Sequence, residues 1–216
     1  MEKIVLIGNG GHSKVVRDLI EAENRYKLFA VLDDQFSSVM ETDILYAPIS
    51  YFKILDNKSM FKLVVAIGNN FTRKRVITEL QLPKFQYATI IHPTAVISPS
   101  VKIGYGTVIM PNAVINAHTI IGNHVIINTS SVVEHDNTIE DYVHIAPNAT
   151  LTGGVMVGEG TQVSAAATVV PNISIGAWSL IGAGSTVIGN IPANSKAVGS
   201  PAKIIEQNMM KGANIK

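Results

Sequence analysis

A six-residue repeat runs through the second half of the chain and constrains its fold more than any other feature. From Ile91 to Pro192 the sequence divides into 17 hexads without an insertion, beginning IHPTAV and ISPSVK. The first position is Ile, Leu or Val in every hexad, and the fifth is Ala, Val, Thr, Ser or Ile in all but one, where it is Asn137. A short fixed period of this kind indicates a solenoid of stacked units.

The period of six excludes simpler arrangements. An α-helix, with 3.6 residues per turn, would scatter every sixth residue over drifting faces, and a flat strand alternates with period two. A coil with three sides fits the period, because each side takes one hexad and the first residue of each hexad points inward. The turns then stack ~4.8 Å apart as parallel strands, and Gly, Asn and Pro at the second to fourth positions form the corners.

Residues 1 to 88 follow a different pattern. The aliphatic runs KIVLIG, KLFAVLDD and KLVVAIGNN are typical of buried strands, and the amphipathic stretches SKVVRDLIEA and FTRKRVITEL are typical of helices. Strands that alternate with helices predict a small parallel sheet with crossover connections. We therefore expect an α/β, Rossmann-like half domain over residues 1–88, followed by an all-β parallel coil with a C-terminal tail over residues 89–216.

Glycines and polar residues follow each predicted strand of the first domain. They are Gly8, Gly10, Gly11 and His12 after the first strand, Asp33 and Asp34 after the second, and Gly68, Asn69 and Asn70 after the third. The carboxyl ends of parallel strands form the usual ligand edge of such a sheet. Glycines there let backbone N–H groups approach a phosphate, and a carboxylate often holds a ribose hydroxyl. Since 88 residues leave no room for a second mononucleotide half, the pattern favours a single nucleotide over a dinucleotide.

The segment EHD, residues 134–136, carries the most reactive cluster in the coil. His135 occupies the third position of its hexad, which points outward, and it lies between Glu134 and Asp136. A carboxylate bonded to one ring nitrogen fixes the tautomer and raises the basicity of the other nitrogen, as a general base requires. The sequence leaves open whether Asp136 or Glu134 provides that carboxylate, and an ordinary surface histidine is the alternative interpretation.

The hexads, together with IGNGGHSKVV, LDD, AIGNN, NTSSVVEHD and GSPAK, resemble a known enzyme family. This is the left-handed parallel β-helix family of bacterial nucleotide-sugar acetyltransferases, which includes N-acetyltransferases of the UDP-N-acetylbacillosamine type and sialic acid O-acetyltransferases. The resemblance covers residues 1 to about 205. It implies the left hand of the coil, acetyl-CoA as the acetyl donor, a UDP-amino-sugar as the acceptor, a homotrimer, and His135 as the base.

The resemblance also implies roles for individual residues. Asp136 would orient the base, and His144 would contact the thioester region of acetyl-CoA. It also places Lys203 near the phosphates of CoA and Asn128 in the acceptor site. Gly153, Ala165 and Ala183 are small residues along the coil that would let acetyl-CoA lie against the backbone, and ordinary corner residues are the alternative interpretation. Two alternatives stay open, namely O-acetylation of sialic acid or another sugar hydroxyl, and a non-catalytic solenoid scaffold.

Composition narrows the classes of function. A formal net charge of +1, from 17 basic and 16 acidic residues without a long basic run, gives no electrostatic footprint for nucleic-acid binding. The absence of cysteine excludes disulfides, a thiolate nucleophile and Cys-ligated metals, and no histidine spacing predicts a metal site. The apolar run at the N-terminus is too short for a signal peptide or a membrane span, so we expect a cytoplasmic protein.

Aliphatic residues at the sixth position of the hexads bear on assembly. They are Val96, Val108, Val114, Ile120, Ile126, Val132 and Leu180. Position six points outward, and seven aliphatic residues in one register exceed what a solvated wall should carry. Burial against neighbouring chains around a three-fold axis would cover them with closed symmetry.

Overall fold

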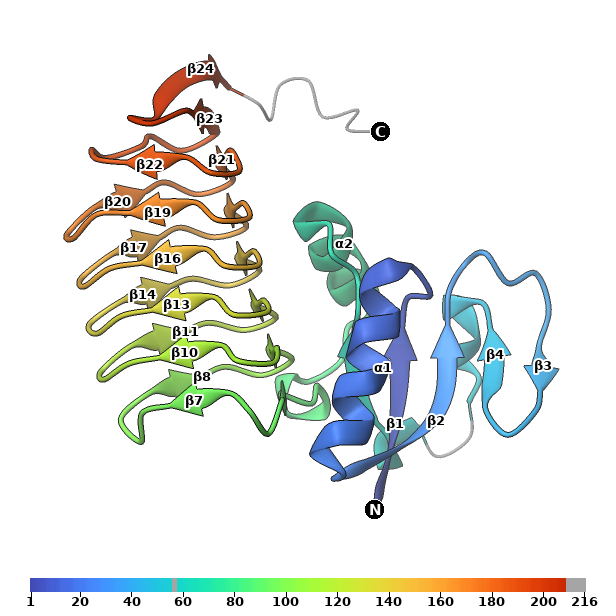
Figure 1. Cartoon of the computed structure of the whole chain (residues 1–216). Helices are drawn as coiled ribbons and strands as arrows, with labels where there is room; N and C mark the ends of the chain where they lie inside the picture. Colours follow the sequence, from blue (N-terminus) through green and yellow to red (C-terminus); the bar gives the residue numbers. More distant parts are fainter. Residues whose placement is uncertain (56–57, 209–216) are drawn as a thin grey trace. The chain divides into compact units, whose positions relative to one another are not determined.

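The computed structural model describes residues 1–55 and 58–208 of the chain. It divides into two compact units, Met1–Pro93 and Thr94–Lys216. The first unit is an α/β layer structure and the second is a coil of short parallel strands (Figure 1). The boundary expected at residues 88 and 89 lies close to this division. Among the described residues, no helix has both the length and the apolar character needed to cross a membrane.

The first unit contains a five-stranded sheet of order β3-β4-β2-β1-β5, in which β1 runs parallel to β2 and β5. Its strands are β1 (Glu2–Ile7), β2 (Tyr26–Leu32), β3 (Met40–Glu41), β4 (Leu45–Ala47) and β5 (Lys62–Val65), with β6 (Ile90–Ile91) at the end of the unit. Its helices are α1 (Gly11–Glu23), α2 (Asn70–Leu80) and the short 3₁₀ helices η1 (Ile49–Lys53), η2 (Lys58–Met60) and η3 (Lys84–Gln86). The predicted Rossmann-like half domain is confirmed, and β3, β4 and the 3₁₀ helices are additions that the sequence pattern did not indicate.

Local chemistry explains where the first helix lies. Its buried stripe of Val16, Leu19 and Ile20 follows helical spacing. The helix ends at Glu23 because Asn24 adopts a left-handed conformation with φ of 55°, from which its N–H reaches the carbonyl of Ile20. Asparagine tolerates this conformation better than most residues.

The second unit is a parallel β-helix with three faces. Face one consists of β7 (Val96–Ile97), β10 (Val114–Ile115), β13 (Val132–Val133), β16 (Thr150–Leu151), β19 (Thr168–Val169) and β22 (Thr186–Val187). Face two consists of β8 (Lys102–Ile103), β11 (Ile120–Ile121), β14 (Thr138–Ile139), β17 (Met156–Val157) and β20 (Ser174–Ile175). Face three is an eight-stranded sheet that begins with β6 and contains β9 (Val108–Ile109), β12 (Ile126–Ile127), β15 (His144–Ile145), β18 (Gln162–Val163) and β21 (Leu180–Ile181), followed by β23 (Ser195–Val198) and β24 (Lys203–Gln207).

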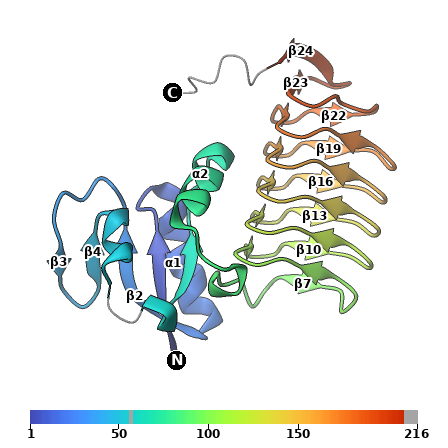
Figure 2. The same ribbon diagram turned by 180° about the vertical axis from the view of Figure 1, so that it is seen from behind.

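The register between turns confirms the predicted coil. From β7 to β19, each strand pairs in parallel with the strand 18 residues later, as Val114 does with Val132 and Ile126 with His144. The stack of these turns is visible from both sides (Figures 1 and 2). First-position residues from Ile109 to Val187 are at most 2% exposed and form the central core. The fold is the left-handed parallel β-helix that the resemblance implied.

The corners require a left-handed residue at the fourth position of the hexad. In 14 successive hexads, from Gly106 to Gly184, this residue has φ between +54° and +70°. Bulky residues such as Tyr142 and Trp178 occupy it as well as glycine and asparagine. Because such residues rarely adopt this conformation by themselves, the stacked coil imposes it on them.

Not all the aliphatic residues at position six are available for assembly. Val96 and Ile120 are 63% and 48% exposed, and Val114, Val132 and Leu180 are partly exposed. Val108 and Ile126 are buried within the chain itself. The set of exposed aliphatics is therefore smaller than the sequence predicted.

Candidate active site

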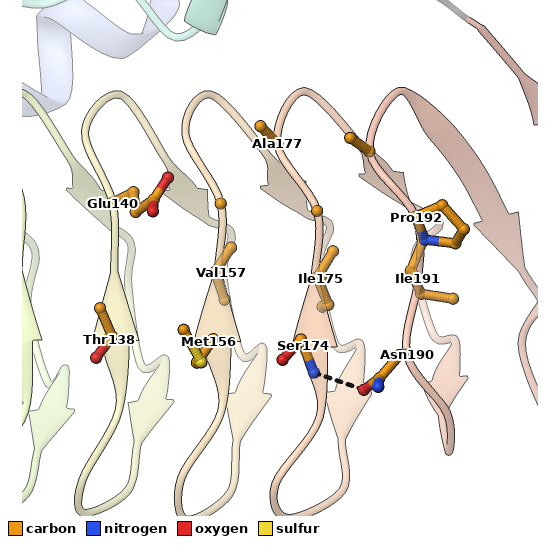
Figure 3. A pocket seen from close by; sticks show the side chains of 13 residues that line it. Thr138, Glu140, Met156, Val157, Ser174, Ile175, Ala177, Asn190, Ile191 and Pro192 are labelled. Carbon is orange, nitrogen blue, oxygen red and sulfur yellow. Dashed lines mark hydrogen bonds between the residues drawn. The ribbon is translucent and has the colours of Figure 1, made fainter.

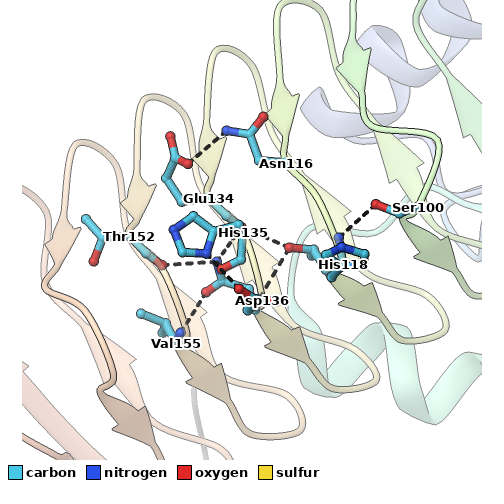
Figure 4. Close-up of polar contacts among 10 residues, drawn as sticks. Ser100, Asn116, His118, Glu134, His135, Asp136, Thr152 and Val155 are labelled. Carbon is cyan, nitrogen blue, oxygen red and sulfur yellow. Dashed lines mark hydrogen bonds and ion pairs between the residues drawn. The ribbon is translucent and has the colours of Figure 1, made fainter.

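His135 projects from the corner between face one and face two, where residues 134–136 connect β13 to β14 (Figure 4). Its Nδ1 lies 2.8 Å from Oδ2 of Asp136, and both side chains are 61% exposed. The contact occupies Nδ1 and leaves Nε2 as the nitrogen able to accept a proton from a substrate. The left-handed φ of 59° at Asp136 turns the chain so that neighbouring side chains meet here.

The other carboxylate of the cluster has a different partner. Oε2 of Glu134 accepts a hydrogen bond from Nδ2 of Asn116, one turn earlier, at 2.9 Å (Figure 4). The sequence left open which acid orients His135, and the structure assigns this contact to Asp136. Asn116 was not predicted, and nothing in the hexad pattern distinguishes it.

Gly153 provides the surface against which the imidazole ring packs. It occupies the same position as His135 one turn later, and a Cβ on Gly153 would stand 2.7 Å from Cε1 of His135. Stacked turns bring equivalent positions this close. A side chain at residue 153 would displace the ring, so the glycine is needed to keep His135 where it is.

His144 and Asn128 form a second polar pair on another side of the coil. Nδ2 of Asn128 lies 2.9 Å from Nε2 of His144, which begins β15 on face three. His135 stands at the corner between faces one and two, and in a three-sided coil that corner lies opposite face three. One chain therefore does not bring the two predicted groups of the coil together.

The small residues predicted for the donor site also divide between sides. Gly153 shares the corner of His135, whereas Ala165 and Ala183 are exposed at the corner between faces three and one. Lys203 is exposed at the start of β24, the antiparallel strand that closes the C-terminal end of face three. Contact of these residues with a ligand stays a prediction.

In the first unit, Asp33 ties the glycine loop to the neighbouring strand. Its Oδ2 accepts from the backbone N–H of Asn9 at 2.7 Å, and its Oδ1 accepts from that of Gln35 at 2.9 Å. Asp34 accepts from the N–H of Ile49 at 3.1 Å. Both carboxylates thus organise loops at the carboxyl edge of the sheet, which is a structural task beyond the predicted contact with a ribose.

Gly10 and Gly11 are glycines that the chain does not need for its own packing. A Cβ on either would meet no atom within 4 Å, and neither adopts a left-handed φ. Gly8 differs, since its φ is +111° and a Cβ would stand 3.0 Å from the carbonyl oxygen of Ala66. Open space over Gly10 and Gly11 is what close approach of a ligand to the backbone requires.

Residues after β5 have structural partners that the sequence did not reveal. Asn69 caps α2 by accepting from the N–H of Thr72 at 2.9 Å. Asn70 is buried, and its Oδ1 accepts from Nη2 of Arg73 at 2.8 Å. Ligand contact by Gly68, Asn69 and Asn70 stays a prediction.

Arg73 is 1% exposed and supports the same loop. Its Nη1 donates to the carbonyls of Ile67 and Gly68 at 2.9 and 3.2 Å. Asn70, Arg73 and Val76 lie on the buried side of α2 at a spacing of three residues. This spacing could have predicted from the sequence that Arg73 faces inward.

His12 lies at the N-terminal end of α1 beside this loop. Burial, together with the positive charge of Arg73, lowers its pKa to about 4. Its Nε2 is buried without a hydrogen-bond partner among the residues that the structure describes. The ring is therefore neutral at physiological pH and retains hydrogen-bonding capacity.

A shallow hollow of about 440 Å³ lies on face two towards the C-terminal end of the coil. Thr138, Glu140, Met156, Ser174 and Asn190 are among the residues that line it (Figure 3). No residue of the predicted site lines this hollow. In the part of the chain that the structure describes, no group of three His, Cys, Asp or Glu side chains is placed to bind a metal ion.

Comparison with known proteins places this geometry in context. Residues 3–80 match the family described as the PglD N-terminal domain. Over 108 residues the chain is 46% identical to UDP-N-acetylbacillosamine N-acetyltransferase of Bacillus subtilis (strain 168), a match that spans 48% of this chain and about half, 49%, of that protein.

Solved structures match almost the whole chain. A mutant of perosamine N-acetyltransferase from Caulobacter crescentus, in complex with CoA and GDP-perosamine, has 34% identity and a TM-score of 0.87 over 95% of this chain and 97% of that one. The acetyltransferase domain of PglB from Neisseria gonorrhoeae FA1090, in complex with acetyl coenzyme A, has 32% identity and a TM-score of 0.85 over 94% and 99%. The resemblance that the sequence motifs indicated is confirmed.

The depressed pKa of His12 predicts a pH dependence of stability. The unfolded chain takes up a proton on this residue near pH 6.5, whereas the folded chain does not until about pH 4. Stability is therefore lost as the pH falls from 6.5 towards 4. Between pH 7 and pH 5 we expect the free energy of unfolding of the wild type to fall by about 2 kcal/mol more than that of His12→Asn.

Chemical denaturation of both proteins at the two pH values measures this difference. Glu23, whose pKa is raised by burial, is common to both proteins and cancels in the comparison. Equal losses of stability in the two proteins would show that His12 is not held neutral in the folded chain.

Proposed function

The chain belongs to the left-handed β-helix family of bacterial nucleotide-amino-sugar N-acetyltransferases, and on that premise we propose that it transfers an acetyl group from acetyl-CoA to the amino group of a UDP-linked 4-amino-sugar. The observation that carries the proposal is the pair formed by His135 and Asp136, with the ring packed on Gly153. A solenoid scaffold has no need for an exposed histidine bound to a carboxylate.

His135 acts as the general base. Its Nε2 accepts the proton as the amine attacks the thioester carbonyl, and Asp136, on Nδ1, stabilises the imidazolium that forms. The new amide forms as the carbon–sulfur bond breaks, and the proton held by His135 is available to the departing thiolate. The chain contains no cysteine, and direct transfer requires no covalent intermediate on the protein.

The donor site is assigned to the coil. Gly153, Ala165 and Ala183 are small residues beside which an extended pantetheine chain can lie against the backbone. Lys203 supplies a positive charge for the phosphates of CoA, and His144 contacts the thioester region. Asn128, which was predicted for the acceptor site, lies beside His144. The solved relatives with bound CoA or acetyl-CoA support acetyl-CoA as the donor.

The acceptor site is assigned to the first unit. Gly10 and Gly11 present backbone N–H groups at the start of α1 to the diphosphate. The neutral ring of His12 supplies a further hydrogen bond, and Asp33 and Asp34 stand where the ribose is expected. The Bacillus subtilis relative is named for a UDP-sugar, and the Caulobacter crescentus relative binds GDP-perosamine. The experiment below therefore compares acceptors that carry uridine with acceptors that carry guanosine.

The catalytic unit is proposed to be a homotrimer. His135 and the pair of His144 with Asn128 lie on opposite sides of one coil, and a neighbouring chain can bring the two groups to one site. Exposed aliphatics at position six, including Val96 and Ile120, support burial against such a neighbour. A cytoplasmic location remains the expectation from the sequence.

Replacing His135 tests the proposed reaction. His135→Ala should lower kcat by about 10²–10⁴ because the general base is lost, and the fold should survive because the side chain is exposed. Acetyl transfer to UDP- and GDP-linked 4-amino-sugars and to their 4-hydroxy analogues, followed by thiol release, measures the change and identifies the acceptor.

His118→Ala is the matched control, since His118 stands at the same corner one turn earlier without a predicted role. A His135→Ala enzyme with near-normal kcat at saturating substrates would exclude His135 as the base. Acetyl transfer to the 4-hydroxy analogue and not to the 4-amino-sugar would show that the enzyme is an O-acetyltransferase.

Gly11→Val tests the acceptor site. The added side chain enters open space in the free protein, so the free energy of unfolding should change by less than about 1 kcal/mol. Calorimetry should find nucleotide-sugar affinity reduced by about tenfold or more and acetyl-CoA affinity unchanged, since one lost contact of about 1.4 kcal/mol is a factor of ten. Equal losses for both ligands would contradict a separate acceptor site on this loop.

Mixed trimers test whether two chains share one site. His135→Ala and His144→Ala should each be poorly active alone. When the two are co-expressed with different tags and purified together, about one site in three of a mixed trimer should combine an intact His135 with an intact His144 from its neighbour. Activity that stays at the level of the separate variants, or a wild type that sediments as an active monomer, would contradict a shared site.

A further inference from the structure

Asn137 is an amide enclosed within the coil directly behind the His135 corner. It is 1% exposed and takes the fifth position of its hexad, which elsewhere holds an aliphatic or hydroxyl residue. Its Nδ2 donates to the carbonyls of Glu134 at 2.6 Å, His135 at 3.3 Å and Thr152 at 3.0 Å. Its Oδ1 accepts from the backbone N–H of Val155 at 3.0 Å. Every polar atom of the side chain is therefore used.

Hydroxyl residues at the same position make only part of this pattern. Thr107 and Thr161 each donate to a carbonyl of the following turn and accept from an N–H of that turn. Ser131 instead donates to the carbonyl of Asn128 in its own corner. Asn137 does both, because its longer amide spans from the corner before it to the next turn of the coil.

The corner that Asn137 braces is the one whose side chain has few contacts of its own. The side chain of His135 is 61% exposed, its Nδ1 contacts Asp136, and its ring lies against Gly153. The direction of the imidazole therefore depends on the backbone of residues 134–136. Asn137 binds the carbonyls of the first two of these residues, immediately before the left-handed Asp136.

We propose that Asn137 is a positioning residue for the reaction, which acts through His135 by fixing the corner from which the imidazole projects. The inference rests on the proposed role of His135 as the base. Asn137 touches no substrate, since the coil encloses it. Because small displacements of a catalytic group lower the rate strongly, loss of the brace should reduce kcat and leave both KM values unchanged.

Two substitutions separate positioning from stability. Asn137→Val fills the space but removes all four hydrogen bonds. A threonine at position 137 can make the same two hydrogen bonds to the next turn that Thr161 makes, one donated to a carbonyl and one accepted from an N–H. Asn137→Thr therefore loses only the hydrogen bonds to the corner. In the threonine variant the carbonyl of Glu134 still accepts from Thr119, and that of His135 from the N–H of Gly154. No buried group is left unsatisfied, so Asn137→Thr should melt close to the wild type.

Thr161→Val is the matched control, since it removes buried hydrogen bonds of the same kind at a corner away from His135. We expect kcat to fall by roughly 10- to 100-fold in Asn137→Val and at least about fivefold in Asn137→Thr, while Thr161→Val stays within about twofold of the wild type. Thermal unfolding should show Asn137→Val and Thr161→Val destabilised alike. Steady-state kinetics well below the midpoints measures these rates.

The His135→Ala background supplies the decisive measurement. A residue that acts through His135 has nothing to position once the imidazole is gone, so adding Asn137→Val should cause no further loss of the residual rate. A further loss in that background, or a kcat for Asn137→Thr equal to that of the wild type, would overturn the inference. A His135→Ala enzyme with normal kcat would instead overturn the proposed base, so the two failures are distinguishable.

Discussion

Parallel pairing between residues 18 apart is the interaction on which the rest of the coil depends. It places equivalent positions of successive turns one above another, about 4.8 Å apart, so each column of side chains is crowded. A large side chain then needs a small one in an adjoining turn. Gly153 gives space to His135, and Gly160 gives space to Trp178 in the same way. The catalytic candidate is therefore defined by its own residue and equally by the glycine one turn away.

The interior of the coil has room for little besides aliphatic side chains, and the few polar ones within it are fully bonded. Unsatisfied buried polar groups are strongly destabilising. Thr107 and Thr161 link turns to one another, and Asn137 links a turn to its own corner. The coil thus combines a repetitive core with one local departure from the repeat, and that departure lies behind His135.

In the first unit, polar side chains at the carboxyl edge of the sheet are likewise hydrogen-bonded within the protein. Asp33 and Arg73 form hydrogen bonds with backbone groups of the loops. Gly10 and Gly11 remain open, and His12 remains neutral with an unused nitrogen. A prepared loop with open backbone suits a ligand that binds through phosphate oxygens.

The sequence by itself determined the three-sided coil and the strand–helix alternation of residues 1–88, and it singled out the EHD cluster as the candidate for the base, because period, alternation and residue type are properties of neighbouring positions along the chain. It also showed that Asn137 departs from the repeat. Only the tertiary structure decided that Asp136 rather than Glu134 contacts His135, that Asn116 holds Glu134, and that His144 faces away from His135. These outcomes depend on the conformation of each corner and on which residues the stacked turns and the three faces bring together, and no local sequence pattern records that geometry.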